Sequence, residues 1–186
     1  MHLEWIDLTA RKAYTGVPLP DRELAAREHV SKIGAIVSGN EVQAAAALWL
    51  DTPRSPDGAA TAFVGHFAST DAGHSKQLLD ALSTEAARAG RTRILAPIDG
   101  STWRSYRVVV ESTGRDPFFL EPQTPPYWEA HLTAAGFKRA EMYASLELAD
   151  LKPFAGRDAY AAELTAAGIT VRDFDMQNFD KDLVKL

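Results

Sequence analysis

Alternating apolar and polar positions predict strands through the first half of the chain. Residues 33–37 alternate up to Gly39-Asn40, and the alternation resumes over residues 42–50, which is typical of two strands joined by a tight turn. Similar patterns predict a first strand over residues 3–8 and a further strand of the same antiparallel meander over residues 61–68. The pattern therefore favours a sheet built from neighbouring segments.

Helical spacing begins where this alternation ends. From residue 75 to residue 89 the apolar positions fall on one helical face, and Gly90 follows where a left-handed residue ends a helix. A shorter helix follows Asp21, a candidate N-cap. The order then continues with a strand (92–98), a short helix (101–106) with Trp103 packed inward, a helix ended by Gly136 (127–135) and a strand (138–148). This order predicts an α+β fold, a mixed, mostly antiparallel sheet flanked by helices.

The last part of the chain differs from the rest. We predict a main domain over residues 1–150 and a C-terminal extension over residues 151–186, in which residues 169–174 form a strand leading into a helix. The pentapeptide LTAAG at residues 132–136 recurs at residues 164–168, through repetition or chance reuse of a helix end. Because an isolated apolar strand leaves an unpaired edge, we expect this extension to dock on its own sheet or on a second copy, giving a possible homodimer.

Composition and charge argue against several classes of partner and of catalytic group. The chain of 186 residues has a mild net charge of -5 with interleaved acids and bases, which does not favour nucleic acid as a partner. It has no cysteine, so thiolate chemistry and cysteine-based metal sites are excluded, and its histidines show no metal-ligand spacing. No run approaches the roughly 18 apolar residues that span a bilayer, so we expect a cytoplasmic protein without a membrane partner or a metal.

Several segments carry a resemblance to a known family. One is a strand that leads through a turn into a helix (62–67, AFVGHF), and another is a helix closed by Gly-Phe (132–137, LTAAGF). The third combines residues 97–107 (PIDGSTWRSYR), 119–122 (FLEP) and 125–127 (PPY). Over residues 3–150 the chain resembles the GNAT superfamily of N-acetyltransferases, in particular a bacterial GNAT-like subgroup that often occurs as tandem repeats.

The resemblance implies that the turn before the second long helix binds an acyl-CoA. A pyrophosphate needs backbone N–H donors at a helix N-terminus, with small residues that allow close approach. The superfamily pattern Q/R-x-x-G-x-G/A falls on residues 70–75, where Gly73 matches and Thr70 replaces the Gln or Arg. A capped helix start, with Ser69, Thr70 or Asp71 as N-cap, explains the same residues. The cofactor-binding residues implied are Phe67, Ala68, Ser69, Gly73, His74 and Ser75.

The resemblance also implies direct attack of an amine on the thioester of acetyl-CoA or another acyl-CoA. His66 is the candidate base because an imidazole titrates near neutral pH, and the alternative is a histidine packed on a sheet face. The superfamily's tyrosine acid corresponds to Leu132, so Tyr127, about a turn earlier, is the candidate acid. Glu121 is a candidate for binding a cationic amine, with simple solvation as the alternative.

Two functions follow from these residues. The first is an N-acyltransferase that acetylates an amine of a small molecule or peptide. The second is a non-catalytic GNAT-like module that binds acyl-CoA or serves in assembly. Thr70, Asp71 and Leu132 favour the second function, whereas Gly73 and the order of the elements favour the first.

Overall fold

The computed structural model describes residues 1–7, 9, 13–118, 121–146, 156–170 and 176–177. The chain divides into two compact units, Met1–Ala140 and Glu141–Leu186. The first unit contains a sheet with helices, and the described part of the second contains the helix α4 (Arg157–Ala166). Each unit is described by itself below.

The sheet of the first unit is mixed and mostly antiparallel. Its main path runs in the order β1-β3-β4-β5-β6, and β2 pairs in parallel with the start of β4. Neighbours along the main path are antiparallel except β5 and β6, which are parallel. The predicted α+β class with such a sheet is confirmed. The strands are β1 (His2–Trp5), β2 (Thr15–Gly16), β3 (Lys32–Ser38), β4 (Glu41–Trp49), β5 (Thr61–Ser69) and β6 (Arg93–Leu95).

The predicted hairpin joins β3 to β4. Ser38 pairs with Glu41, which leaves Gly39 and Asn40 as a two-residue loop. Gly39 has φ 62°, whereas Asn40 is not among the residues with positive φ. A positive φ at the first loop position alone is the pattern of a type II′ turn, which glycine adopts without steric cost.

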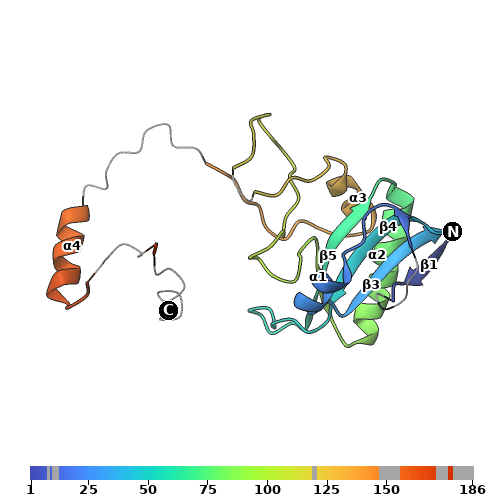
Figure 1. The fold of residues 1–186 in the computed structure, drawn as a ribbon, viewed down its shortest axis with the longest axis horizontal. Coiled ribbons are helices and arrows are strands. Elements are labelled where there is room, and N and C mark those ends of the chain that lie inside the picture. The colour runs from blue at the N-terminus through green and yellow to red at the C-terminus, as the bar shows by residue number, and fades with distance from the viewer. Residues whose placement is uncertain (8, 10–12, 119–120, 147–155, 171–175, 178–186) are drawn as a thin grey trace. The chain divides into compact units, whose positions relative to one another are not determined.

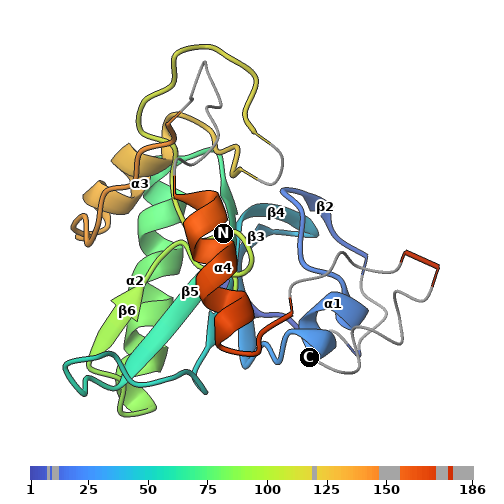
Figure 2. The same ribbon diagram turned by 90° about the vertical axis from the view of Figure 1, so that its left-hand side faces the viewer.

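Helices cover both faces of the sheet (Figures 1 and 2). On one face lie α2 (Ala72–Arg88) and α3 (Trp128–Ala134), whose leucines pack on alternate residues of the central strands. On the other face lies α1 (Arg22–Arg27), which buries Ala25 against Trp49. The α2 face forms the larger part of the core, because its cluster of buried residues is larger than the clusters on the α1 face. Each fully buried leucine contributes roughly 1.5–3 kcal/mol. The fully buried leucines of the α2 face are Leu78, Leu79 and Leu82.

Bulges interrupt the alternation of the two central strands. Ala47 pairs with Gly65 and Ala45 pairs with Ala68, so two residues of β5 lie opposite Ala46 alone. A second irregularity lies between β3 and β4, where the register shifts between Ile36 and Val37. An extra residue sends the following side chains to the opposite face of the sheet. The bulge in β5 therefore determines which face His66 reaches.

Two predicted elements are wrong. Residues 138–146 are exposed and form no strand, and residues 147–148 lie outside the described part. Alternation alone does not stabilise a strand, because its backbone groups need a paired neighbour. Residues 101–106 form turns instead of a helix, since Asp99 N donates to Ser105 O (2.8 Å) and closes the segment on itself. Trp103, predicted to pack inward, is 96% exposed.

The repeated LTAAG segments end two helices in the same way. After α3, Phe137 N donates to Leu132 O (3.1 Å), and Gly136 has φ 89°. After α4, Ile169 N donates to Leu164 O (2.9 Å), and Gly168 has φ 74°. Such a bond next to a left-handed glycine satisfies carbonyl groups at a helix end. Of the strand predicted over residues 169–174, residues 169–170 form no strand, and residues 171–175 lie outside the described part.

Candidate functional site

The bulge in β5 carries His66 to the face of the sheet that α1 covers. Ala62, Val64 and Phe67 belong to the core on the α2 face, whereas the ring of His66 contacts that of Trp49, with the centroids 5.6 Å apart and the planes tilted by 45°. The φ of His66 is 45°, a conformation that few residues other than glycine adopt. Regular alternation from Ala62 would have placed His66 among the leucines of α2.

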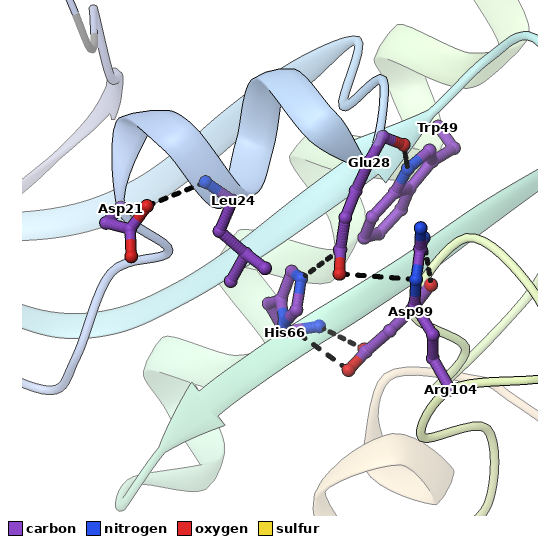
Figure 3. Close-up of polar contacts among 7 residues, drawn as sticks. All are labelled: Asp21, Leu24, Glu28, Trp49, His66, Asp99 and Arg104. Atoms are coloured by element: carbon purple, nitrogen blue, oxygen red, sulfur yellow. Dashed lines mark hydrogen bonds and ion pairs between the residues drawn. The ribbon is translucent and has the colours of Figure 1, made fainter. Parts of the chain in front are cut away.

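His66 lies between two carboxyl groups (Figure 3). Its Nε2 lies 2.7 Å from Oε2 of Glu28, and its Nδ1 lies 3.3 Å from Oδ2 of Asp99. The backbone N–H of His66 also donates to Oδ1 of Asp99 at 2.6 Å. Arg104 completes the group, since its Nε lies 3.3 Å from Oε1 of Glu28. These four residues are called the His66 cluster below.

Local structure brings these residues together. Glu28 follows the last turn of α1, and its carbonyl accepts a hydrogen bond of 2.8 Å from Nε1 of Trp49. Asp99 follows the segment after β6, where Ile98 N donates to Val64 O at 2.8 Å. A side chain at Gly65 would overlap with the carbonyl oxygen of Ile98 and the carboxylate of Asp99. Only glycine at this position allows Asp99 to approach the strand so closely.

The surroundings of Asp99 in the His66 cluster alter the pKa of its carboxyl group. Burial raises the pKa of the Asp99 carboxyl above its ordinary value of 3.8, and the charge of Glu28 acts in the same direction. The hydrogen bond from His66 N and the charges of His66 and Arg104 act against this rise. Each ring nitrogen of His66 faces a carboxyl oxygen, from Glu28 at Nε2 and from Asp99 at Nδ1. Imidazole and carboxyl groups at these distances are the side chains that act in general acid–base catalysis.

A small pocket adjoins the cluster where β5 and the segment after β6 separate. Backbone hydrogen bonding between them extends to the bond that Ile98 N donates to Val64 O. At the next position of β5, the N–H of His66 donates to the side chain of Asp99 instead of to the backbone. The pocket has a volume of about 120 Å³. Its lining residues are His66, Phe67, Pro97, Asp99, Ser105, Arg107, Pro122, Gln123, Thr124 and Trp128. In a sheet with parallel strands, ligands commonly bind where neighbouring strands separate at their carboxyl ends.

The residues predicted to bind the cofactor lie at the end of β5 and in the first turn of α2. The helix begins at Ala72, so Gly73, His74 and Ser75 are helical. Asp71 is the N-cap, and its Oδ1 accepts a bond of 2.8 Å from His74 N. This bond is the main cause that holds the pKa of Asp71 below 3.8. A phosphate at this helix end would meet the Asp71 carboxylate.

The side chains in this segment differ in exposure. Gly73 is exposed, and Ala68 and His74 are partly exposed. Phe67, Ser69 and Ser75 are buried. The ring of Phe67 packs edge-on against Trp128 at 5.1 Å, and Oγ of Ser75 lies 3.0 Å from Nδ1 of His131. These buried side chains have internal partners, so contact with a ligand would depend on the backbone.

The structure does not bring Tyr127 and Glu121 into the pocket lining. Tyr127 precedes α3, is 39% exposed, and its ring lies 5.0 Å from that of His131. Glu121 accepts a hydrogen bond of 3.1 Å from Phe118 N through Oε2. Of the three predicted catalytic residues, His66 alone lines the pocket.

Glu28, Asp99 and Arg104 were not predicted to act with His66. Asp99 and Arg104 lie in the segment 97–107 (PIDGSTWRSYR) that the sequence analysis singled out, which was the available signal. For Glu28 there was no signal in the sequence that linked it to His66, because 38 positions separate the two residues.

Comparison of the chain with protein-family models, curated proteins and solved structures gives no match. Among the described residues, none of the helices combines the length and apolar character needed to cross a bilayer. The same residues contain no group of three or more His, Asp or Glu side chains placed to hold a metal ion.

Proposed function

We propose that the chain is a GNAT-type N-acyltransferase, which transfers an acetyl or other acyl group from acyl-CoA to an amine. The observation that carries this proposal is the His66 cluster beside a pocket at the separation of β5 from the segment after β6. The resemblance over residues 3–150 and the mixed, mostly antiparallel sheet support it.

The proposed reaction requires a group that removes a proton from the acceptor ammonium. Asp99 and His66 both line the pocket, and they lie 3.3 Å apart through Oδ2 and Nδ1. In this role they take the proton together, and Glu28 and Arg104 hold the imidazole and balance its charge. The uncharged amine then attacks the thioester carbon, the C–S bond breaks and the CoA thiolate leaves. The nitrogen loses a second proton, which neutralises the thiolate, so the products are the N-acylated amine and the CoA thiol.

The test is acetyl-CoA binding and turnover by the full chain. Calorimetric titration measures binding, and release of the CoA thiol in the presence of a panel of amines measures transfer. Removal of a general base lowers the rate by about 10²–10⁴-fold, so His66→Gln and Asp99→Asn should reduce kcat by this order while acetyl-CoA still binds. His2→Gln is the control, because His2 is exposed on the edge strand β1. Absence of binding at millimolar acetyl-CoA would eliminate the proposal.

Asp71 favours a second candidate, a non-catalytic GNAT-like module. Its carboxylate already bonds an amide of the first turn of α2, where a pyrophosphate would bind. Binding of acetyl-CoA without transfer to any amine would support an acyl-CoA-binding module. Failure of the wild type to bind, with binding gained by Asp71→Ala, would identify the carboxylate as the obstacle and favour a role in assembly.

A further inference from the structure

A tryptophan in the wall of the pocket carries a buried hydrogen-bond donor. Trp128 lines the pocket, and its Nε1 is buried without a hydrogen-bond partner among the described residues. By contrast, Nε1 of Trp49 donates to the carbonyl of Glu28 at 2.8 Å. A buried donor left unpaired costs roughly 1–3 kcal/mol, and a catalytic role is one of the explanations for such a group in a native protein. The indole N–H is a donor only, so its partner must be an acceptor atom.

Packing places this indole near the proposed base. The ring of Trp128 packs edge-on against the ring of Phe67, with the centroids 5.1 Å apart. Phe67 directly follows His66 in β5, so the indole contacts the residue next to the imidazole. Trp128 is also the first residue of α3, and its backbone N–H donates to the carbonyl of Pro125 at 3.1 Å. Its backbone is therefore held, whereas its ring can still turn, because the torsion between Cβ and an indole has a broad range.

The pocket is small enough that one bound group reaches both side chains. Its volume is about 120 Å³, less than the roughly 150 Å³ of a cavity that holds benzene. It therefore takes only a few non-hydrogen atoms, which suits the reacting end of an acyl thioester and excludes the rest of the CoA molecule. His66 and Phe67 point to opposite faces of the sheet, but both line the pocket, because it lies where β5 separates from the segment after β6. A group bound there is within reach of the imidazole and of the indole.

We infer that Trp128 is a catalytic residue whose Nε1–H donates a hydrogen bond to the carbonyl oxygen of the acyl thioester. This inference rests on the proposed function. Because neighbouring atoms cover Nε1, the indole turns toward the pocket when the acyl group enters. The amine nitrogen bonds to the carbonyl carbon, and the π electron pair of the C=O bond moves to the oxygen, which becomes negative. When this pair returns and re-forms the C=O bond, the C–S bond breaks, and the thiolate that leaves takes up the second proton that the nitrogen loses.

The charge on the oxygen determines where this bond acts in the reaction. Hydrogen bonds to an ionised oxygen are roughly twice as strong as those between neutral groups, so the bond from the indole strengthens as the amine attacks. Trp128→Phe removes the N–H and keeps an aromatic ring against Phe67. Removal of one donor to such an oxygen lowers kcat by about 10²–10³-fold, so this variant should lose about 10²-fold in kcat. The KM for acetyl-CoA should change by less than about threefold, because the bond is stronger in the transition state than with bound substrate.

The experiment combines kinetics with the indole signals of the wild type. Acetyl transfer to an amine found in the panel is assayed for wild type, for Trp128→Phe and for the control Trp103→Phe, whose indole is 96% exposed and whose kcat should equal that of wild type. In parallel, nitrogen-15-labelled wild type is titrated with acetyl-CoA and with CoA in the absence of amine, and NMR follows the indole N–H resonances. The resonance missing from Trp128→Phe belongs to Trp128; should that variant not fold, substitution of the other tryptophans assigns it by elimination. It should move downfield with acetyl-CoA and stay nearly in place with CoA, which lacks the thioester carbonyl.

The outcomes separate this inference from the proposed function. Turnover by Trp128→Phe within about threefold of wild type, or an indole resonance that responds equally to acetyl-CoA and CoA, would overturn the inference and leave the acyltransferase proposal standing. A lower kcat together with a lower free energy of unfolding in urea, and no response of the resonance to acetyl-CoA, would assign Trp128 a structural role and also overturn the inference. Wild type that does not bind acetyl-CoA would reject the proposed function, and this inference with it.

Discussion

The contact between Glu28 and His66 should stabilise the fold far more than an exposed ion pair of the same length. Oε2 of Glu28 lies 2.7 Å from His66 Nε2, and the two side chains are 6% and 19% exposed. Lys76 and Asp80 on α2 also lie 2.7 Å apart, but their side chains are 52% and 54% exposed. The two contacts have the same length but differ in burial, so the exposed pair is the control.

A double-mutant cycle measures each coupling energy. Hydrogen bonds to charged groups contribute roughly 1.5–3 kcal/mol, so we expect about 2 kcal/mol between Glu28 and His66. Exposed pairs four positions apart on a helix contribute about 0.3–0.5 kcal/mol, which is the expectation for Lys76 and Asp80. The variants are Glu28→Ala and His66→Asn for the first pair, and Lys76→Ala and Asp80→Ala for the second. Asparagine tolerates the positive φ of His66 and is too short to reach Glu28.

Urea unfolding followed by tryptophan fluorescence gives the four free energies of each cycle. The four tryptophans, at positions 5, 49, 103 and 128, all lie in the first unit, so the signal reports on that unit. The ring of Trp49 contacts that of His66, so we expect its fluorescence to report on the His66 cluster. A coupling for Glu28 and His66 no larger than that for Lys76 and Asp80 would refute the reasoning from burial.

The remaining predictions concern Gly65, Asp99 and Asp71. Gly65→Ala should destabilise the fold by about 1–3 kcal/mol in urea unfolding, because the added methyl group overlaps with Ile98 and Asp99. The control Gly73→Ala should remain within about 1 kcal/mol of the parent. Equal effects of the two substitutions would contradict this prediction. Burial raises the pKa of Asp99, so its stabilising contribution is complete below about pH 3.8 and is lost as the pH rises through the folded-state pKa. The stability of wild type relative to Asp99→Asn should therefore fall as the pH rises above about 3.8, and a rise would show that the sign is wrong. The pKa of Asp71 is lowered, so its stabilising contribution is present above about pH 3.8 and is lost as the pH falls through the folded-state pKa. Asp71→Ala should therefore unfold at a lower temperature than wild type near neutral pH, and the difference in unfolding temperature should narrow in acid. A gap independent of pH would argue against capping by the carboxylate.

The sequence predicted the turns and helices that neighbouring residues determine by themselves. The turn at Gly39-Asn40 and the helix before Gly90 follow from backbone preferences and spacing that a few neighbouring residues determine. The strand predicted over residues 138–148 fails because alternation does not reveal whether a paired neighbour exists. The short helix predicted at 101–106 fails because the bond from Asp99 to Ser105 closes a turn instead.

The site was less predictable than the sheet. His66 was identified, but its partners lie 38 and 33 positions away and meet it only after the strands have paired. No pattern within β5 marks the bulge, which results from the register between β4 and β5. Alternation alone would have assigned His66 to the wrong face of the sheet. The acyltransferase function and its cofactor-binding residues stay predictions that the acetyl-CoA titration tests.

The extra residue in β5 has a consequence for how this protein tolerates insertions and deletions. Removing Phe67 would restore a one-to-one match between β5 and β4 around Ala46, and the imidazole of His66 would turn toward the leucines of α2. A change in the length of β5 would thus abolish the cluster even though Glu28, His66, Asp99 and Arg104 were all still present. For this strand, residue count constrains the chemistry as strictly as residue identity.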